Sequence, residues 1–121
     1  MPQKYDVIIV GSGPAGIFSA LEITEKTDLS VLMLDRGQDI NQRKCPASRG
    51  FECVHCDPCS LLSGWGGSGA FSDGKLTLST EVGGWLNQYV SLGELEKLVS
   101  SVDDIYLRFG ATKDIYGGDV E

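Results

Sequence analysis

The chain has 121 residues, of which 41% are apolar and 22% are charged, proportions typical of a folded domain and not of a disordered segment. Ten basic residues against seventeen acidic ones give a net charge of −7, which argues against the basic surface that nucleic-acid binding requires. The apolar runs are too short to cross a bilayer, and the N-terminus shows no secretory signal. We therefore expect a cytoplasmic protein that contacts neither nucleic acid nor membrane.

The first 35 residues predict a complete β-α-β unit. Residues 5–10 are apolar and rich in β-branched side chains, which is typical of a buried parallel strand. Pro14 suits the first turn of a helix because its missing N–H group would have no partner there. That helix is expected to end at Thr27 and Asp28, and residues 30–34 form a second buried strand that Asp35 closes.

The turn between the first strand and the helix has the pattern G-x-G-x-x-G, formed by Gly11, Ser12, Gly13, Pro14, Ala15 and Gly16. A strand before this turn, a helix after it and an acid at the end of the next strand are the context in which the pattern predicts dinucleotide binding. Gly11 permits the tight turn, Gly13 lets a diphosphate approach the backbone, and Gly16 lets the helix pack closely on the strand. The alternative is an ordinary β-α-β turn that happens to be rich in glycine.

Asp35 predicts which dinucleotide the turn binds. A carboxylate at the end of the second strand can accept hydrogen bonds from ribose hydroxyl groups, and it disfavours a 2′-phosphate. FAD or NAD is therefore expected, and NADP is not.

Residues 36–64 show no sustained helical or strand period and contain all four cysteines: Cys45, Cys53, Cys56 and Cys59. Close thiol spacing suits a zinc ion or an iron–sulfur cluster, and we expect these four residues to hold one. Two other interpretations remain open, namely a redox-active thiol pair such as Cys53 with Cys56, and structural thiols without chemistry. His55 is interpreted as a loop residue and not as a ligand.

A second glycine-rich segment covers residues 64–76. Its backbone N–H groups could lie against a planar ring or a diphosphate, and Lys75 could face a flavin. A surface turn explains the residues of this segment equally well. Residues 75–79 alternate in polarity and predict a short strand.

The last third of the chain predicts one amphipathic helix over residues 92–109. Ser91 and Glu94 form a capping box at its start, apolar residues recur at spacings of three and four, and Gly110 marks its end.

Two sets of residues carry a family resemblance. Asp35, Arg36 and Gly37 resemble the second strand end of the flavoprotein disulfide-reductase and oxidase superfamily. The cysteine pattern followed by Gly-Gly-Ser-Gly-Ala-Phe-Ser-Asp-Gly-Lys resembles the N-terminal part of a family of bacterial and archaeal FAD-dependent dehydrogenases. The resemblance implies a Rossmann-like fold in which the second glycine-rich segment approaches FAD. The cofactor-binding residues are then expected to be Gly11, Ser12, Gly13, Pro14, Ala15, Gly16, Asp35, Arg36, Gly67, Ser68, Gly69 and Lys75.

The whole chain, residues 1–121, is interpreted as the N-terminal portion of an FAD-binding domain in a flavin-dependent oxidoreductase. Because only two parallel strands are predicted, we expect the rest of a longer chain or a second subunit to complete the domain. Two alternatives stay open: a non-catalytic Rossmann-like scaffold with a structural zinc site, and a fragment of an NAD-binding dehydrogenase. No substrate, electron acceptor or catalytic residue is indicated by the sequence.

Overall fold

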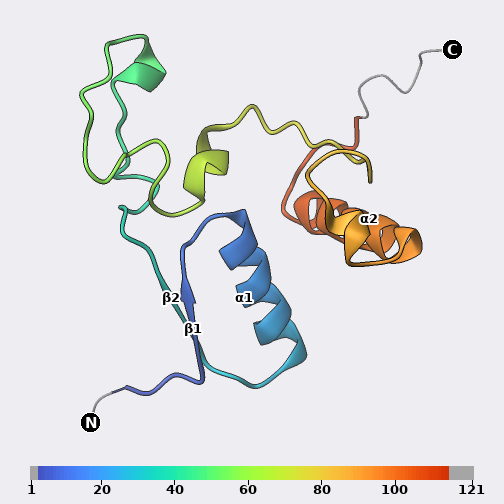
Figure 1. Cartoon of the computed structure of the whole chain (residues 1–121). Helices are drawn as coiled ribbons and strands as arrows, with labels where there is room; N and C mark the ends of the chain where they lie inside the picture. Colours follow the sequence, from blue (N-terminus) through green and yellow to red (C-terminus); the bar gives the residue numbers. More distant parts are fainter. Residues whose placement is uncertain (1–2, 115–121) are drawn as a thin grey trace, which may run out of the picture. The chain divides into compact units, whose positions relative to one another are not determined.

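The structure, a computed structural model, describes residues 3–114 and divides into two compact units, one that ends at Asp73 and one that begins at Gly74 (Figure 1). The first unit contains strand β1 (Val7–Val10), helix α1 (Pro14–Lys26) and strand β2 (Val31–Leu34).

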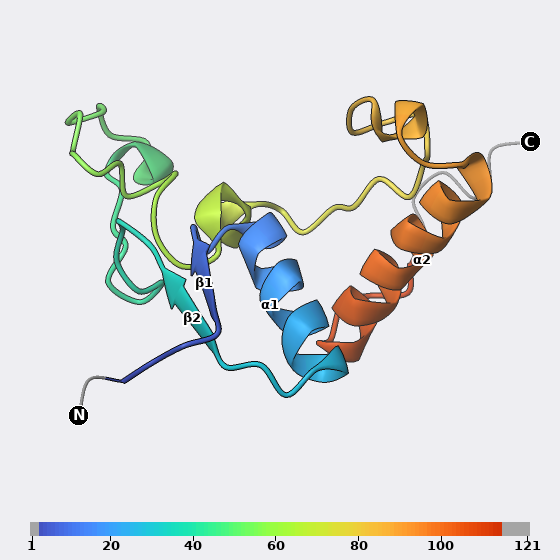
Figure 2. The same cartoon turned by 60° about the horizontal axis from the view of Figure 1, so that its bottom comes forward.

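The two strands pair in parallel, with Val7 opposite Val31 and Val10 opposite Leu34. Helix α1 connects them and packs along the sheet (Figure 2). The β-α-β unit predicted from the sequence is therefore confirmed, together with the two-stranded parallel sheet that positions the site.

Both strands begin later than predicted, because the polar residues Asp6 and Ser30 hold each other at the start of the sheet. The Ser30 backbone N–H and hydroxyl groups donate to Asp6 Oδ2 at 2.8 and 2.6 Å, and the Asp6 N–H group donates to the Ser30 carbonyl oxygen at 3.1 Å. These contacts join the two chain segments just before the regular backbone hydrogen bonds between the strands begin.

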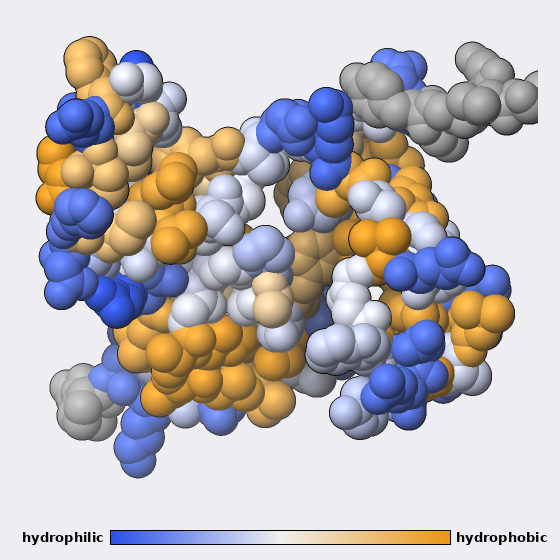
Figure 3. All heavy atoms as spheres, turned by 45° about the horizontal axis from the view of Figure 1, so that its top comes forward, coloured by the Kyte–Doolittle hydropathy of each residue, from blue (hydrophilic) through white to orange (hydrophobic). Residues whose placement is uncertain are grey.

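Only one face of the small sheet is covered by α1. Ile8, Val10 and Leu34 are exposed, with Val10 at 84%. The space-filling view shows an apolar surface on the part of the molecule that contains the two strands (Figure 3).

The rest of the first unit is irregular chain with two short 3-10 turns, η1 (Ala47–Arg49) and η2 (Gly67–Phe71). This agrees with the predicted long structured loop. Among the described residues of this unit, Ser12 and Arg43 are buried polar side chains, at 0% and 4% exposure. The loop is therefore organised around polar contacts.

The second unit contains the 3-10 turn η3 (Leu86–Gln88) and helix α2 (Leu92–Arg108), with Leu95 buried at 7% exposure. The predicted capping box is confirmed: the Glu94 N–H group donates to Ser91 Oγ, and the Ser91 N–H group donates to Glu94 Oε2. The helix ends one residue before the prediction. Within residues 3–114, no helix combines the length and the apolar character needed to cross a membrane.

The predicted strand over residues 75–79 is wrong, because this segment has no regular secondary structure. A strand needs a partner for its backbone hydrogen bonds, and the described part of the second unit contains no other strand. Alternation of two leucines with polar residues was too weak a signal.

Candidate functional site

The first glycine turn has the backbone that its spacing predicts. Gly11 has φ +105°, a conformation that side-chain-bearing residues rarely adopt. A Cβ atom on Gly16 would lie 2.0 Å from the Gly11 carbonyl oxygen, so only glycine lets α1 approach the end of β1 this closely. The roles predicted for Gly11 and Gly16 are therefore confirmed.

Gly13 differs from Gly16 because the space into which its side chain would point is empty. A Cβ atom on Gly13 would meet no atom within 4 Å. Gly13 is also the N-cap of α1, Pro14 follows it, and no side chain caps the helix. The first-turn amide groups therefore have no capping side chain, which is the arrangement that suits an anionic phosphate group.

Asp35 joins the glycine turn to the chain that follows β2. Its Oδ2 accepts the Ser12 backbone N–H at 2.8 Å and the Ser12 hydroxyl at 2.9 Å, and its Oδ1 accepts the Gly37 N–H at 2.8 Å. These donors, the Ser12 and Gly37 amides above all, lower the pKa of Asp35 from 3.8 to about 2. Asp35 therefore carries a negative charge at every physiological pH.

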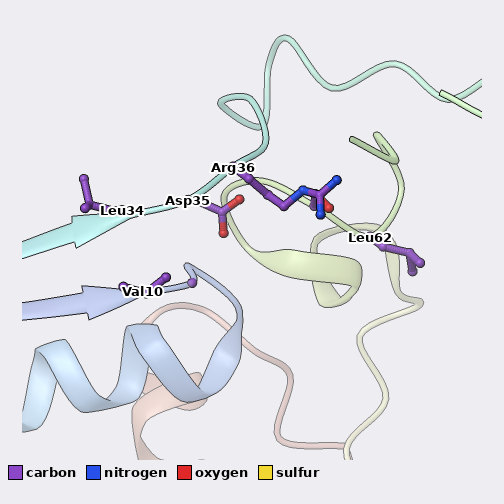
Figure 4. Close-up of a pocket in the computed structure, with 7 residues that line it drawn as sticks. Val10, Leu34, Asp35, Arg36 and Leu62 are labelled. Carbon is purple, nitrogen blue, oxygen red and sulfur yellow. The ribbon is translucent and has the colours of Figure 1, made fainter. Parts of the chain in front are cut away.

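A pocket of about 500 Å³ lies at the carboxyl ends of the two strands. Val10 and Gly11 line it from β1 and the turn, Leu34, Asp35 and Arg36 line it from the end of β2, and Leu62 and Ser63 line it from the facing loop (Figure 4). Ligands of open parallel sheets bind at this end of the strands. The pocket therefore combines apolar walls with one fixed anionic group.

The second glycine-rich segment packs against the first glycine turn. The Gly66 N–H group donates to the Ser12 carbonyl oxygen at 2.9 Å. Cβ atoms on Gly67 and Gly69 would lie 3.1 Å from Gly13 Cα and 3.6 Å from Pro14 Cγ. The structure thus brings together two predicted site segments that lie more than fifty residues apart in the sequence.

Arg43 holds this second segment, and the sequence analysis did not identify it. Its guanidinium group donates to three backbone carbonyl oxygens, those of Ser60 at 3.0 Å, Leu61 at 2.7 Å and Trp65 at 2.6 Å. The guanidinium carbon also lies 4.7 Å from the centre of the Phe71 ring. A single arginine in a loop gives no periodic or motif signal, so sequence alone could not separate it from the exposed charges around it.

Other predicted site residues have different surroundings. Ser12 is fully buried and its side chain faces Asp35, so it shapes the turn from within. Arg36 forms an exposed ion pair with Asp57 beside the pocket. Lys75 belongs to the second unit and is not assigned to the pocket by the structure, so its predicted role stays a prediction.

The four cysteines line a second pocket of about 230 Å³, together with Pro46, Val54 and His55. All four are free thiols. Within residues 3–114, however, no three His, Cys, Asp or Glu side chains are grouped closely enough to hold a metal ion. The predicted zinc or iron–sulfur site is therefore not shown by the structure and stays a prediction.

Comparisons with known proteins link the chain to reductases and oxidoreductases. It is 35% identical over 97 residues to digeranylgeranylglycerophospholipid reductase of Methanosarcina mazei, covering 74% of this chain and 24% of that protein. It is 43% identical over 54 residues to thioredoxin reductase of Listeria monocytogenes, covering 41% and 17%. It is 40% identical over 43 residues to the mitochondrial electron transfer flavoprotein-ubiquinone oxidoreductase of Oryza sativa subsp. japonica, covering 31% and 8%.

These three proteins are reductases or oxidoreductases by name, so the chain resembles a part of such enzymes. The chain spans no more than about a quarter of the length of these relatives. No family model matches it. No solved structure matches it significantly.

Proposed function

We propose that the first unit binds FAD and belongs to a flavin-dependent oxidoreductase. The observation that carries this proposal is the open space at Gly13, which lies at the uncapped start of α1. A diphosphate in this space would accept hydrogen bonds from the first-turn amide groups and would lie at the positive end of the helix dipole.

Asp35 supports an adenine dinucleotide in particular. A carboxylate has about four acceptor positions. Ser12 and Gly37 donate three short hydrogen bonds to Asp35 and the Gly64 amide is a fourth donor, so a ribose hydroxyl group would share an oxygen that already accepts one of them beside the pocket. Its fixed negative charge would repel a 2′-phosphate, which favours FAD or NAD over NADP.

The choice of FAD rests on the kind of protein to which the chain is similar. Two reductases and an electron transfer flavoprotein-ubiquinone oxidoreductase match stretches of this chain at 35–43% identity. FAD, when bound, supplies the electron or hydride transfer, and the protein binds and orients it. This chain would contribute the diphosphate and ribose contacts, and Gly67 and Gly69 would keep the turn in shape from the outside.

The test is a fluorescence titration of the chain with FAD in a Trp85→Phe background, which leaves Trp65 as the only tryptophan. Trp65 lies in the segment that packs on the glycine turn and is 47% exposed. We expect FAD to quench Trp65, NAD to bind more weakly, and NADP to bind least.

Gly13→Glu should weaken FAD binding about tenfold or more, because its carboxylate would occupy the phosphate position while the backbone φ of −73° accepts it without strain. The matched control is Gly93→Glu, which adds the same charge in α2, where a Cβ also meets no atom within 4 Å. Unchanged FAD affinity in Gly13→Glu, with the control also unchanged, would contradict the proposed diphosphate site.

A further inference from the structure

A single basic side chain, that of Arg36, lies among the described residues that line the pocket at the carboxyl ends of β1 and β2. Its guanidinium group forms an ion pair with the carboxylate of Asp57, which lies 21 residues further along the chain and is not among the residues that line this pocket. Figure 4 shows the Arg36 side chain extending from the end of β2 toward the loop that contains Leu62. A residue of the cysteine-containing loop therefore binds the cation of the pocket.

A basic residue beside the acid at the end of β2 can decide between two classes of dinucleotide. In dinucleotide sites of parallel sheets, an acid near this position binds the ribose 2′-hydroxyl group, and a nearby arginine accommodates a 2′-phosphate. This chain has both kinds of residue in succession, Asp35 and then Arg36. The selectivity of the pocket therefore depends on what else holds the arginine.

Asp57 changes the charge that a 2′-phosphate would meet at this pocket. Asp35 and Arg36 carry opposite charges that offset each other, and the Asp57 carboxylate adds a negative charge to these two. A phosphate monoester carries about two negative charges at neutral pH, so the added charge repels it. The Arg36 N–H group that donates to Asp57 is also not available to a phosphate oxygen.

We propose that Asp57 is a specificity-determining residue of the dinucleotide pocket, which binds Arg36 and so excludes ligands that carry a 2′-phosphate. The inference rests on the proposed function, because it assigns a second selectivity element to the same pocket. Asp35 repels a 2′-phosphate by its own charge, whereas Asp57 withholds the arginine that would attract one. The two acids come from different parts of the first unit, the end of β2 and the cysteine-containing loop.

The exposure of the ion pair determines how large the effect of Asp57 can be. The side chains of Arg36 and Asp57 are 68% and 88% exposed. Exposed ion pairs are weak and are screened by salt, so Asp57 shifts the position of Arg36 without fixing it. Removing the Asp57 charge should therefore raise the affinity for a 2′-phosphate ligand by about fivefold at low salt. The gain should shrink at about 1 M salt, where charges more than about 3 Å apart are screened.

The experiment titrates Asp57→Asn and the parent chain with NADP, NAD and FAD, and follows Trp65 fluorescence in the Trp85→Phe background. NADP differs from NAD only by its 2′-phosphate, and FAD has none. We expect Asp57→Asn to bind NADP about fivefold more tightly, while its affinities for NAD and FAD change by less than about twofold. Poor folding cannot produce this result, because it would weaken the binding of all three ligands.

Two further variants separate the ion pair from the net charge of the chain. Glu52→Gln is the matched control, because it removes the same formal charge at an exposed residue of the same loop, and it should leave the NADP affinity unchanged. Asp57→Asn combined with Arg36→Gln removes both charges of the ion pair. This double variant should return the NADP affinity to that of the parent chain, because the arginine that binds the 2′-phosphate is gone.

The titrations distinguish failure of this inference from failure of the FAD proposal. An unchanged NADP affinity in Asp57→Asn, with FAD bound by both chains, would overturn the role of Asp57 and leave the FAD site standing. A gain that persists in the double variant would also overturn it, because Arg36 would then not be the group that Asp57 withholds. FAD binding by neither chain would contradict the dinucleotide site itself, and this inference with it.

Discussion

The β-α-β region and the loop that follows it build one site by different means. Half-buried aliphatic side chains and a connecting helix hold β1, α1 and β2 together, as in any parallel sheet. The loop up to Asp73 has almost no regular structure, and buried polar contacts hold it. The comparison shows that a glycine-rich loop can be ordered without an apolar core when charged side chains form hydrogen bonds with its backbone.

Asp35 and Arg43 are the centres of these two regions and act with opposite charge. Asp35 accepts three hydrogen bonds from N–H and O–H groups, which ties the glycine turn to the chain after β2. Arg43 donates three hydrogen bonds to carbonyl oxygens, which folds residues 60–65 around its guanidinium group. Removing each charge should therefore disturb a different half of the site.

The largest effect is expected from Arg43→Ala. The substitution removes three charge-assisted hydrogen bonds and leaves three carbonyl groups without their donor, so it should lower the free energy of unfolding by about 4 kcal/mol. Urea unfolding followed by Trp65 fluorescence in the Trp85→Phe background measures it, because the Trp65 carbonyl oxygen is one of the three acceptors. Arg49→Ala, at an exposed arginine of the same loop, should change it by about 0.5 kcal/mol or less. Equal urea midpoints of unfolding for Arg43→Ala and wild type would show that the buried Arg43 guanidinium group does not stabilise the loop.

A smaller effect is expected from Gly16→Ala, which tests the β-α-β region. Its Cβ atom would lie 2.0 Å from the Gly11 carbonyl oxygen, so α1 must move away from the strand at a cost of about 2 kcal/mol. Gly13→Ala is the matched control, because its Cβ atom meets open space. Thermal unfolding followed by circular dichroism should separate the two variants, and equal melting temperatures would refute the close approach of helix and strand.

The smallest effect concerns pH and Asp35. A carboxyl group whose pKa is lowered to about 2 contributes stability that is complete above its ordinary value of 3.8 and is lost as the pH falls toward 2. Wild type should therefore be more stable than Asp35→Asn near neutral pH, and the difference should disappear between about pH 4 and pH 2. Asp28→Asn, at an exposed residue before β2, serves as the control. Carboxyl NMR that gave Asp35 a pKa near 3.8 would contradict the hydrogen bonds to Ser12 and Gly37.

The β-α-β region was predictable because its signals are local. Strand periodicity, the glycine spacing and Pro14 each act within a few residues, and the structure places all of them as expected. The strand starts were missed by one or two residues because Asp6 and Ser30 bond through their side chains, which a period of apolar residues does not report.

The loop was only partly predictable because its contacts join distant residues. The glycine content of residues 64–76 predicted that their backbone lies against a planar ring or a diphosphate. Only the fold shows that Gly67 and Gly69 approach Gly13 and Pro14. Arg43 carries no signal in the sequence, since its acceptors are backbone carbonyl groups that any residue possesses. The spacing of the cysteines likewise predicted that they lie close together, and the structure places all four around one pocket.

The most direct test of the account is an amide NMR titration of the isotopically labelled chain with FAD. If the diphosphate binds at the start of α1 and the ribose binds at Asp35, the amide signals of Gly13, Ala15, Gly16 and Asp35 should shift together and saturate at one equivalent. Signals of α2 should stay unchanged. Saturable FAD binding that left the signals of Gly13, Ala15 and Gly16 in place, or no binding at all, would contradict the dinucleotide site proposed for this chain.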